Sequence, residues 1–464
     1  MRIIRKRRAM LDLFLLSFVL AFLGAGFKRP FIFVLAYVYI DVVSPQKVSW
    51  GILTQIPISL IAFLLAFGAW FVAEDKNGTR FSLRQFLMLM LLIYCGMTTQ
   101  QADFPLEAGE KWSWVWKALV FAMFLPLTLR TRLRIEALTL IMVLSVGVIV
   151  IGGGIKTLTG GGGYGELRLL VDNNTGLYES SIISAVAIAV IPLALWLSRF
   201  GTIFPPEWRV KVFAWALCFS CALMPIGTGA RTGLVCVVVL AALILRTAKR
   251  RVMILSLMAA GALVTVPLLP AEFVARMSTI SNHQSDESAS TRVAVWMWTL
   301  DFVKTRPFGG GFDAYRQNKL EYNAVTAKQA GDNNTALEYR PVMDQARAYH
   351  SSYFEMLGEQ GYPGLAMWLA LHLLGLWQME VLRRRFRKDD SEAFRWVSPL
   401  AEALQQAQVI YLVGSTFVGI AFQPFCYMLV GLQCGLWAYI QRVKAAQPVP
   451  FRKPRELRQA PATA

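Results

Sequence analysis

Three histidines occur in the chain, and their surroundings suit them to different tasks. His283 lies in a polar run and is expected to be solvated, whereas His372 lies inside an apolar segment and is expected to be buried. Because ionisable side chains within membrane segments often have a function, a functional role for His372 stays an alternative. His350 stands where a long polar segment meets the next apolar one, so it could reach a lipid-borne group and a hydroxyl in water. With an ordinary pKa of about 6.5, an imidazole at this position suits a general base at neutral pH.

Two arginines stand at similar boundaries. Arg231 lies in a glycine-containing junction between two apolar segments, and Arg292 opens a helical stretch one turn before Trp296. A positive charge at a helix start opposes the helix dipole, so helix stability does not explain Arg292. A guanidinium binds phosphate oxygens through two parallel hydrogen bonds, which predicts a phosphate site; the alternatives are a lipid-phosphate anchor or a structural ion pair. Further candidates on the same side are Arg168, Arg340 and Arg347.

A third polar group, Asp172-Asn173-Asn174, directly precedes an apolar segment. These side chains either cap the following helix or bind a sugar hydroxyl. Carboxylates and histidines do not cluster at the spacing of metal ligands. The sequence therefore predicts no metal and no cofactor, and it disfavours a metal-dependent sugar-nucleotide transferase.

Membrane helices must position these residues. Of 464 residues, 56% are hydrophobic and only 16% are charged, against about 25% charged residues in a typical soluble protein. This composition excludes an ordinary soluble enzyme, and the hydrophobicity excludes a disordered chain. The net charge of +18 comes from basic clusters between apolar segments, as in the cytoplasmic loops of membrane proteins. Because no nucleic-acid-binding motif accompanies these clusters, nucleic acid is not a predicted partner, whereas membrane lipids are.

The apolar segments predict an all-α, polytopic membrane protein. A cytoplasmic N-terminus and a cytoplasmic tail require an even number of spans, so we expect about twelve transmembrane helices, with residues 9–44 the least determined. The candidate segments are 10–26, 30–44, 53–73, 84–101, 113–129, 135–155, 178–199, 209–226, 229–245, 252–269, 352–379, 405–422 and 424–441. The expected parts are an N-terminal helix bundle (1–269), a periplasmic loop domain (270–350), C-terminal membrane helices (351–443) and a cytoplasmic tail (444–464).

The segment 270–350 is long for a connection, and such connections are usually functional or disordered. Its aromatic content and its periodicity favour a folded, partly helical loop. A helix is predicted over 291–304, because Val293, Trp296, Leu300 and Val303 recur at helical spacing. A stop at Arg306-Pro307 and a glycine-rich turn at 308–312 follow.

Several of these motifs together resemble the bacterial O-antigen ligase and polysaccharide polymerase superfamily. The most specific element, His350-Ser351 followed by Gly361, is matched in full. An Arg-xxx-Leu element is matched by Arg231, with Val235 in place of leucine. The other matching elements are Asp172-Asn173-Asn174, Arg292-xxx-Trp296, Pro307-Phe308-Gly309-Gly310-Gly311-Phe312 and Gly364. The segments at 28–31 and 44–51 are similar to the exosortase-associated branch of O-glycosylation ligases.

This resemblance implies an inverting, metal-independent glycosyltransferase of the GT-C type. It would lie in the bacterial inner membrane with its active site facing the periplasm. The donor would be a glycan on undecaprenyl pyrophosphate, and the acceptor would be a sugar hydroxyl of lipid A–core. His350 would be the general base, and Arg231 and Arg292 would bind the pyrophosphate. The further candidate substrate-binding residues are Tyr349, Arg347, Asp172, Asn174 and Arg168.

Three other functions stay open. A polysaccharide polymerase or a protein O-glycosylation ligase of the same superfamily would use the same donor with a different acceptor, and the sequence does not separate these. A transporter of lipid-linked glycan is less favoured, because transporters usually carry internal repeats and broken helices at the membrane midplane. Here the ionisable residues gather at one membrane face instead.

Overall fold

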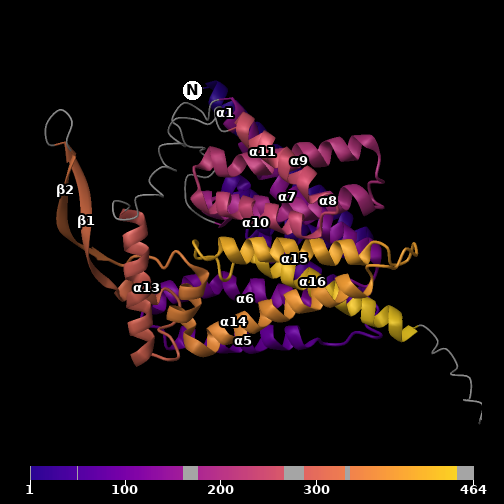
Figure 1. The fold of residues 1–464 in the computed structure, drawn as a ribbon. Helices are drawn as coiled ribbons and strands as arrows, with labels where there is room; N and C mark the ends of the chain where they lie inside the picture. The colour runs from indigo at the N-terminus through magenta and orange to yellow at the C-terminus, as the bar shows by residue number, and fades with distance from the viewer. Residues whose placement is uncertain (1, 50, 160–175, 266–286, 330–334, 447–464) are drawn as a thin grey trace, which may run out of the picture.

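The computed structural model describes residues 2–49, 51–159, 176–265, 287–329 and 335–446 (Figure 1). Most of the residues that the structure describes are helical. Its helices are α1 (Arg2–Lys28), α2 (Phe31–Val43), α3 (Pro45–Val48), α4 (Ile58–Ala73), α5 (Leu83–Gln100), α6 (Pro105–Thr128), α7 (Arg132–Leu158), α8 (Ser180–Phe200), α9 (Trp208–Thr228), α10 (Arg231–Thr247), α11 (Arg251–Thr265), α13 (Glu287–Thr305), α14 (Ser352–Arg385), α15 (Val397–Gly414) and α16 (Pro424–Ala446). The strands are β1 (Lys319–Gln329) and β2 (Thr335–Gln345).

Among the described residues, five helical segments are long and apolar enough to cross a membrane, and the chain is an all-α membrane protein. These segments are Phe31–Val48, Arg132–Leu158, Ser180–Phe200, Trp208–Thr228 and Ser352–Arg385. The total of about twelve spans stays a prediction. One expected boundary is wrong: the predicted span 405–422 is not continuous, because α15 ends at Gly414 and residues 415–423 form turns, bends and irregular backbone. The apolar composition of those turns hides the helix end in the sequence.

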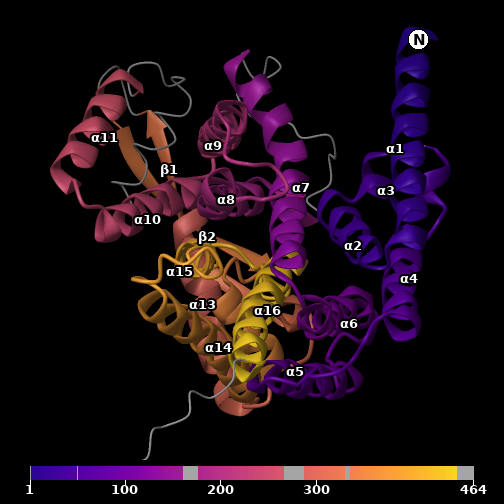
Figure 2. The ribbon, with the colours of Figure 1, turned by 90° about the vertical axis from the view of Figure 1, so that its right-hand side faces the viewer.

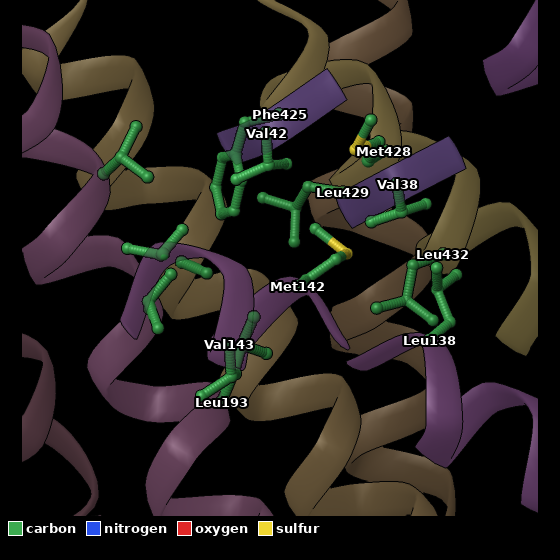
Figure 3. Packing of buried hydrophobic residues seen from close by; sticks show 14 of the residues in the cluster. Val38, Val42, Leu138, Met142, Val143, Leu193, Phe425, Met428, Leu429 and Leu432 are labelled. Carbon is green, nitrogen blue, oxygen red and sulfur yellow. The ribbon is translucent and has the colours of Figure 1, made fainter. Parts of the chain in front are cut away.

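Most of the long helices run side by side, as seen along the bundle in Figure 1 and end-on in Figure 2. The main core lies where α2, α7, α8 and α16 meet (Figure 3). Its side chains are aliphatic, aromatic and methionine residues, among them Val38, Val42, Leu138, Met142, Val143, Leu193, Phe425, Met428, Leu429 and Leu432. The tight packing of this core holds the helices in place, and the candidate residues Arg231 and His350 lie at or near helix starts.

The first helix runs antiparallel to the second. Ser49, beyond the end of α2, donates a hydrogen bond to Asp12 of α1 over 2.8 Å. At the start of α2, the guanidinium of Arg134 lies over the Phe31 ring at 5.0 Å. The beginning of α1 therefore lies at the opposite end of the bundle from the basic loop at 130–134. The sequence predicted both on the cytoplasmic side, and the structure does not place them at one end.

Helix α13 and the hairpin of β1 and β2 belong to the predicted loop domain, and both lie at the end of the bundle where α14 begins. Helix α13 runs across that end and packs against α14 and β1 (Figure 1). Its observed range, Glu287–Thr305, confirms the helix predicted over 291–304. The hairpin of β1 and β2 projects away from the helices in Figure 1, and its strands pair antiparallel from Lys319–Gln345 to Gln329–Thr335. The sequence did not predict this hairpin.

Candidate active site at the start of α14

His350 lies two residues before α14 and stands between buried neighbours. Tyr349 and Ser351 are 2% and 1% exposed, whereas His350 itself is exposed. The backbone of His350 has φ of +48°, in the left-handed region that non-glycine residues seldom occupy. Such a conformation costs free energy and persists only where the surrounding structure enforces it. The fold therefore directs this imidazole outward from an otherwise buried junction.

Helix α13 holds the residue before His350 in place. The indole N–H of Trp296 donates to the carbonyl of Tyr349 over 2.9 Å. The Trp296 ring also stacks on Phe354 of α14, with ring centres 4.9 Å apart and an angle of 4° between the planes. Arg292 lies one helical turn before Trp296 on α13. The predicted Arg292-xxx-Trp296 element thus links α13 to the His350 junction through its tryptophan.

The base of the hairpin holds the same junction from the other side. Asn318 is fully buried, and its side chain makes two hydrogen bonds to the backbone of Arg347: Oδ1 accepts from the N–H over 3.0 Å, and Nδ2 donates to the carbonyl over 2.7 Å. The Asn318 carbonyl also accepts from the N–H of Ala346 over 3.1 Å. Asn318 was not identified from the sequence, because a single asparagine in a polar loop carries no signal.

The charges around His350 favour its neutral form. The residue keeps an exposed surface, yet the surrounding protein displaces enough water that desolvation lowers its pKa below the ordinary value of 6.5. The positive charges of Arg292 and Arg347 lower the pKa further. Arg347 lies three residues before His350, and Arg292 lies one helical turn before Trp296, whose indole donates to the carbonyl of Tyr349. A neutral imidazole can accept a proton at neutral pH, as a general base must.

The first expected result concerns pH. The acid limb of kcat/KM should lie below pH 6.5, because activity is lost only where falling pH protonates His350. Replacing Arg347 by Gln removes one positive charge, which raises the pKa of His350 and moves that limb to higher pH. The exposed Arg306, which pairs with Asp103 over 3.1 Å, provides the control Arg306→Gln, with an unmoved limb. An unmoved limb in Arg347→Gln would show that this charge does not act on the imidazole.

Gly361, the last residue of the predicted motif, interrupts α14. Its φ of +62° and ψ of −167° are not helical. The glycine-rich turn after α13 pairs with the backbone at this kink. The three hydrogen bonds run from Gly310 N to the Gly358 carbonyl (3.0 Å), from Gly311 N to the Glu359 carbonyl (2.9 Å) and from Tyr362 N to the Pro307 carbonyl (3.0 Å). The motif spacing is therefore the distance along the chain from His350 to the kink at Gly361, where the glycine-rich turn pairs with α14.

Arg231 begins α10 at the same end of the bundle. Thr232, the next residue, lies near Gly414 at the end of α15. The carbonyl of Ser415, the residue after Gly414, accepts a hydrogen bond from the N–H of Ser352 over 2.8 Å. Ser352 also donates through its hydroxyl to the Val418 carbonyl over 2.9 Å. The end of α15 thus lies between the helix that Arg231 opens and the helix that follows His350.

The other candidate residues fall into three groups. Arg168, Asp172, Asn174 and His283 lie outside the described residues, and so does the side chain of Arg340. Tyr349 does not present its ring to solvent, because its phenol is buried against Gly358 and its ring meets Tyr315 edge-on at 5.6 Å. His372 is buried as expected, with Nδ1 2.9 Å from the side-chain amide of Gln408.

Comparison with protein families assigns two parts of the chain. Residues 10–202 match a family of unknown function (DUF5935), and residues 214–369 match the O-antigen ligase family. The match at 214–369 supports an O-antigen ligase-like superfamily for this part of the chain. The O-antigen ligase match contains Arg231, Arg292, His350 and Gly361. No curated protein matches the chain.

Proposed function

We propose that the chain is a glycosyltransferase that ligates a lipid-linked glycan to an acceptor hydroxyl. The observation that carries this proposal is the His350 junction within the O-antigen ligase match. There desolvation, and then the charges of Arg292 and Arg347, lower the pKa of an outward imidazole and favour its neutral form. A neutral base beside guanidinium groups suits a reaction that deprotonates a hydroxyl while a phosphate group departs.

In the proposed reaction, the imidazole of His350 takes the proton of the acceptor hydroxyl. The hydroxyl oxygen forms a bond to the anomeric carbon from the face opposite the pyrophosphate, so the configuration at that carbon inverts. The bond between this carbon and the pyrophosphate oxygen breaks, and the electron pair leaves with the pyrophosphate. Arg231 and Arg292 bind the pyrophosphate and stabilise its added charge, and Arg347 contributes a further positive charge. Because the leaving group is already activated, positioning and charge stabilisation supply most of the catalysis.

The proposal includes a location and substrates. The donor is a glycan on undecaprenyl pyrophosphate, and the acceptor is lipid A–core. The protein lies in the inner membrane with a GT-C-type arrangement of about twelve spans, and the His350 end faces the periplasm. The basic loops at 130–134, 246–251 and 382–388 support this orientation. The basic run at 2–8 does not, because the start of α1 lies at the other end of the bundle from residues 130–134.

Purified protein supplied with lipid-linked glycan and lipid A–core tests the proposal. Glycan joined to the core supports a ligase. Extension of the glycan on its carrier would instead identify a polymerase, and transfer to a protein acceptor would identify an O-glycosylation ligase. If the donor stays intact with each of these acceptors, the proposed function is wrong.

The arginines give a second expected result. Arg231→Lys and Arg292→Lys should each slow transfer about tenfold or more, because loss of a charge-assisted bidentate contact costs about 1.5–3 kcal/mol. Steady-state rates in membranes with equal protein levels measure the effect. Arg384→Lys is the matched control, since Arg384 is exposed and pairs with Glu380 over 2.6 Å. It lies in the basic segment at 382–388, at the other end of α14 from His350. Wild-type rates in both test variants would identify these arginines as structural.

A third expected result concerns metals. Among the residues that the structure describes, no group of three or more His, Cys, Asp or Glu is arranged to hold an ion. Guanidinium groups can hold a pyrophosphate without one. Treatment with EDTA should therefore leave the transfer rate nearly unchanged. Loss of activity that only magnesium or manganese restores would contradict the metal-independent mechanism.

A further inference from the structure

A buried ion cluster joins α6 to the first turns of α14. The ammonium of Lys111 lies 2.6 Å from Glu355 Oε1, and 2.8 and 2.9 Å from the two carboxylate oxygens of Glu359. The side chains are 13%, 8% and 0% exposed, respectively. One lysine thus contacts two carboxylates that are four residues apart on one face of α14.

The same carboxylates bind two further segments. Oε1 of Glu359 accepts from the N–H of Asp313 over 3.0 Å, and Oε2 of Glu355 accepts from the N–H of Ala421 over 3.0 Å. The Asp313 carboxylate itself lies 4.0 Å from the Lys111 ammonium. Asp313 ends the glycine-rich turn, and Ala421 lies between α15 and α16. Lys111 therefore stands where four separate stretches of chain meet.

This cluster directly underlies the His350 junction. The N–H of Glu355 donates to the carbonyl of Ser351 over 2.8 Å, in the first turn after His350. The backbone carbonyl of Glu359 accepts from Gly311. The phenol of Tyr349, beside His350, fits against Gly358, where an added Cβ would lie 2.3 Å from the phenol oxygen. Displacing either glutamate would shift the backbone on both sides of His350.

The cluster also crosses the two family matches. Lys111 lies within the match at 10–202, whereas Glu355, Glu359 and His350 lie within the O-antigen ligase match at 214–369. Buried ion pairs contribute little net stability, because desolvation offsets their attraction, but they can select one geometry over others. At this cluster the interaction between the two matched parts of the chain is therefore charged.

We infer that Lys111 is a positioning residue for His350: by binding Glu355 and Glu359 together, it fixes the first turns of α14 and so the direction of the imidazole. The inference rests on the proposed function. Lys111 touches neither donor nor acceptor in this role. Its loss should lower kcat while leaving the KM for lipid-linked donor nearly unchanged.

The double variant Lys111→Met/Glu359→Gln tests this inference. It removes one positive and one negative charge together, and glutamine keeps an oxygen that can accept from Asp313 N. We expect kcat to fall about 10- to 100-fold, since misplacement of a catalytic group by about 1 Å has effects of this size. The donor KM should stay within about threefold, because the arginines are untouched. The control Lys304→Met removes an exposed lysine that pairs with Asp301 over 2.7 Å, and it should behave as wild type.

A milder variant decides the matter if the double variant does not fold. Glu359→Gln keeps the Lys111–Glu355 pair, and we expect a several-fold lower kcat at unchanged KM. Wild-type kcat in the folded double variant, or in Glu359→Gln where only that variant folds, would overturn the inference.

Hydrogen exchange separates this inference from the proposed function, because it needs no substrate. The amides of Gly310, Gly311 and the first turn of α14 should exchange faster in the variants than in wild type, while the amides of α8 should not change. Unchanged exchange at these amides would disprove the positioning role, whatever the activity. If the wild-type protein transfers no glycan but exchange rises as expected, the proposed function fails and the structural role of Lys111 stands.

Discussion

Replacing His350 by Asn is expected to lower glycan transfer by about 10²- to 10⁴-fold, the usual contribution of a general base. Asparagine is the informative substitution because it tolerates the left-handed conformation, with φ of +48°, that His350 adopts. Alanine would add backbone strain to the chemical loss. The measurement is the initial transfer rate in membranes with equal protein levels.

His283→Ala is the control for a histidine in the same predicted loop, and it should stay within a few-fold of the wild-type rate. The sequence predicts that His372→Ala also stays within a few-fold of the wild-type rate. Its buried contact with Gln408 makes it a poorer control, because truncation there leaves a cavity and removes one hydrogen-bond partner of the Gln408 side-chain nitrogen. Full activity of His350→Asn together with an inactive His283→Ala would place the base elsewhere in the loop.

Replacing Gly361 by Ala is expected to prevent correct folding of the site and to lower the yield of folded protein sharply. An added Cβ would lie 2.2 Å from the Pro307 carbonyl oxygen and 2.6 Å from the Gly309 nitrogen, and backbone atoms cannot move aside as flexible side chains can. The conformation at Gly361 is itself nearly confined to glycine and costs other residues about 1–3 kcal/mol before any clash. Thermal unfolding in detergent and the yield of monodisperse protein measure the loss.

Gly68 provides the matched control for this substitution. It lies within α4, and an added Cβ would meet no atom within 4 Å. Gly68→Ala should therefore keep or slightly raise stability, because alanine favours the helix by about 0.5–1 kcal/mol. If the Gly361→Ala protein is as stable as Gly68→Ala, the glycine-rich turn at 308–312 can move away from the kink in α14 without loss of stability.

The sequence could predict the helices and the surface residues of the site because both depend on local patterns. Apolar periodicity marks α13, and the spacing of His350 and Gly361 marks the motif. The reason for that spacing was not predictable. It depends on Gly310 and Gly311 pairing with carbonyls at the kink, which is a tertiary contact between two loops.

The buried part of the site was missed for a different reason. Glu355 and Glu359 stand four residues apart in an apolar segment, and a buried carboxylate pair calls for a cationic partner. That signal was present in the sequence. The partner, Lys111, lies 248 residues from Glu359 along the chain, and one sequence holds nothing that joins them. The hairpin was missed because its polar residues carry no clear alternation.

The contacts at the base of the hairpin allow the hairpin and the His350 junction to change independently in evolution. Asn318, just before β1, makes hydrogen bonds to the backbone of Arg347, after β2, and so joins the two strands at their base. The geometry at His350 therefore does not depend on how far β1 and β2 extend. Relatives of this protein could lengthen or shorten the hairpin in paired steps, since an even change in each strand keeps every side chain on its face. The projecting hairpin could then diverge in length and sequence while the geometry at His350 stayed constant. A chimera that exchanges 319–345 between relatives is the natural way to alter one property without the other.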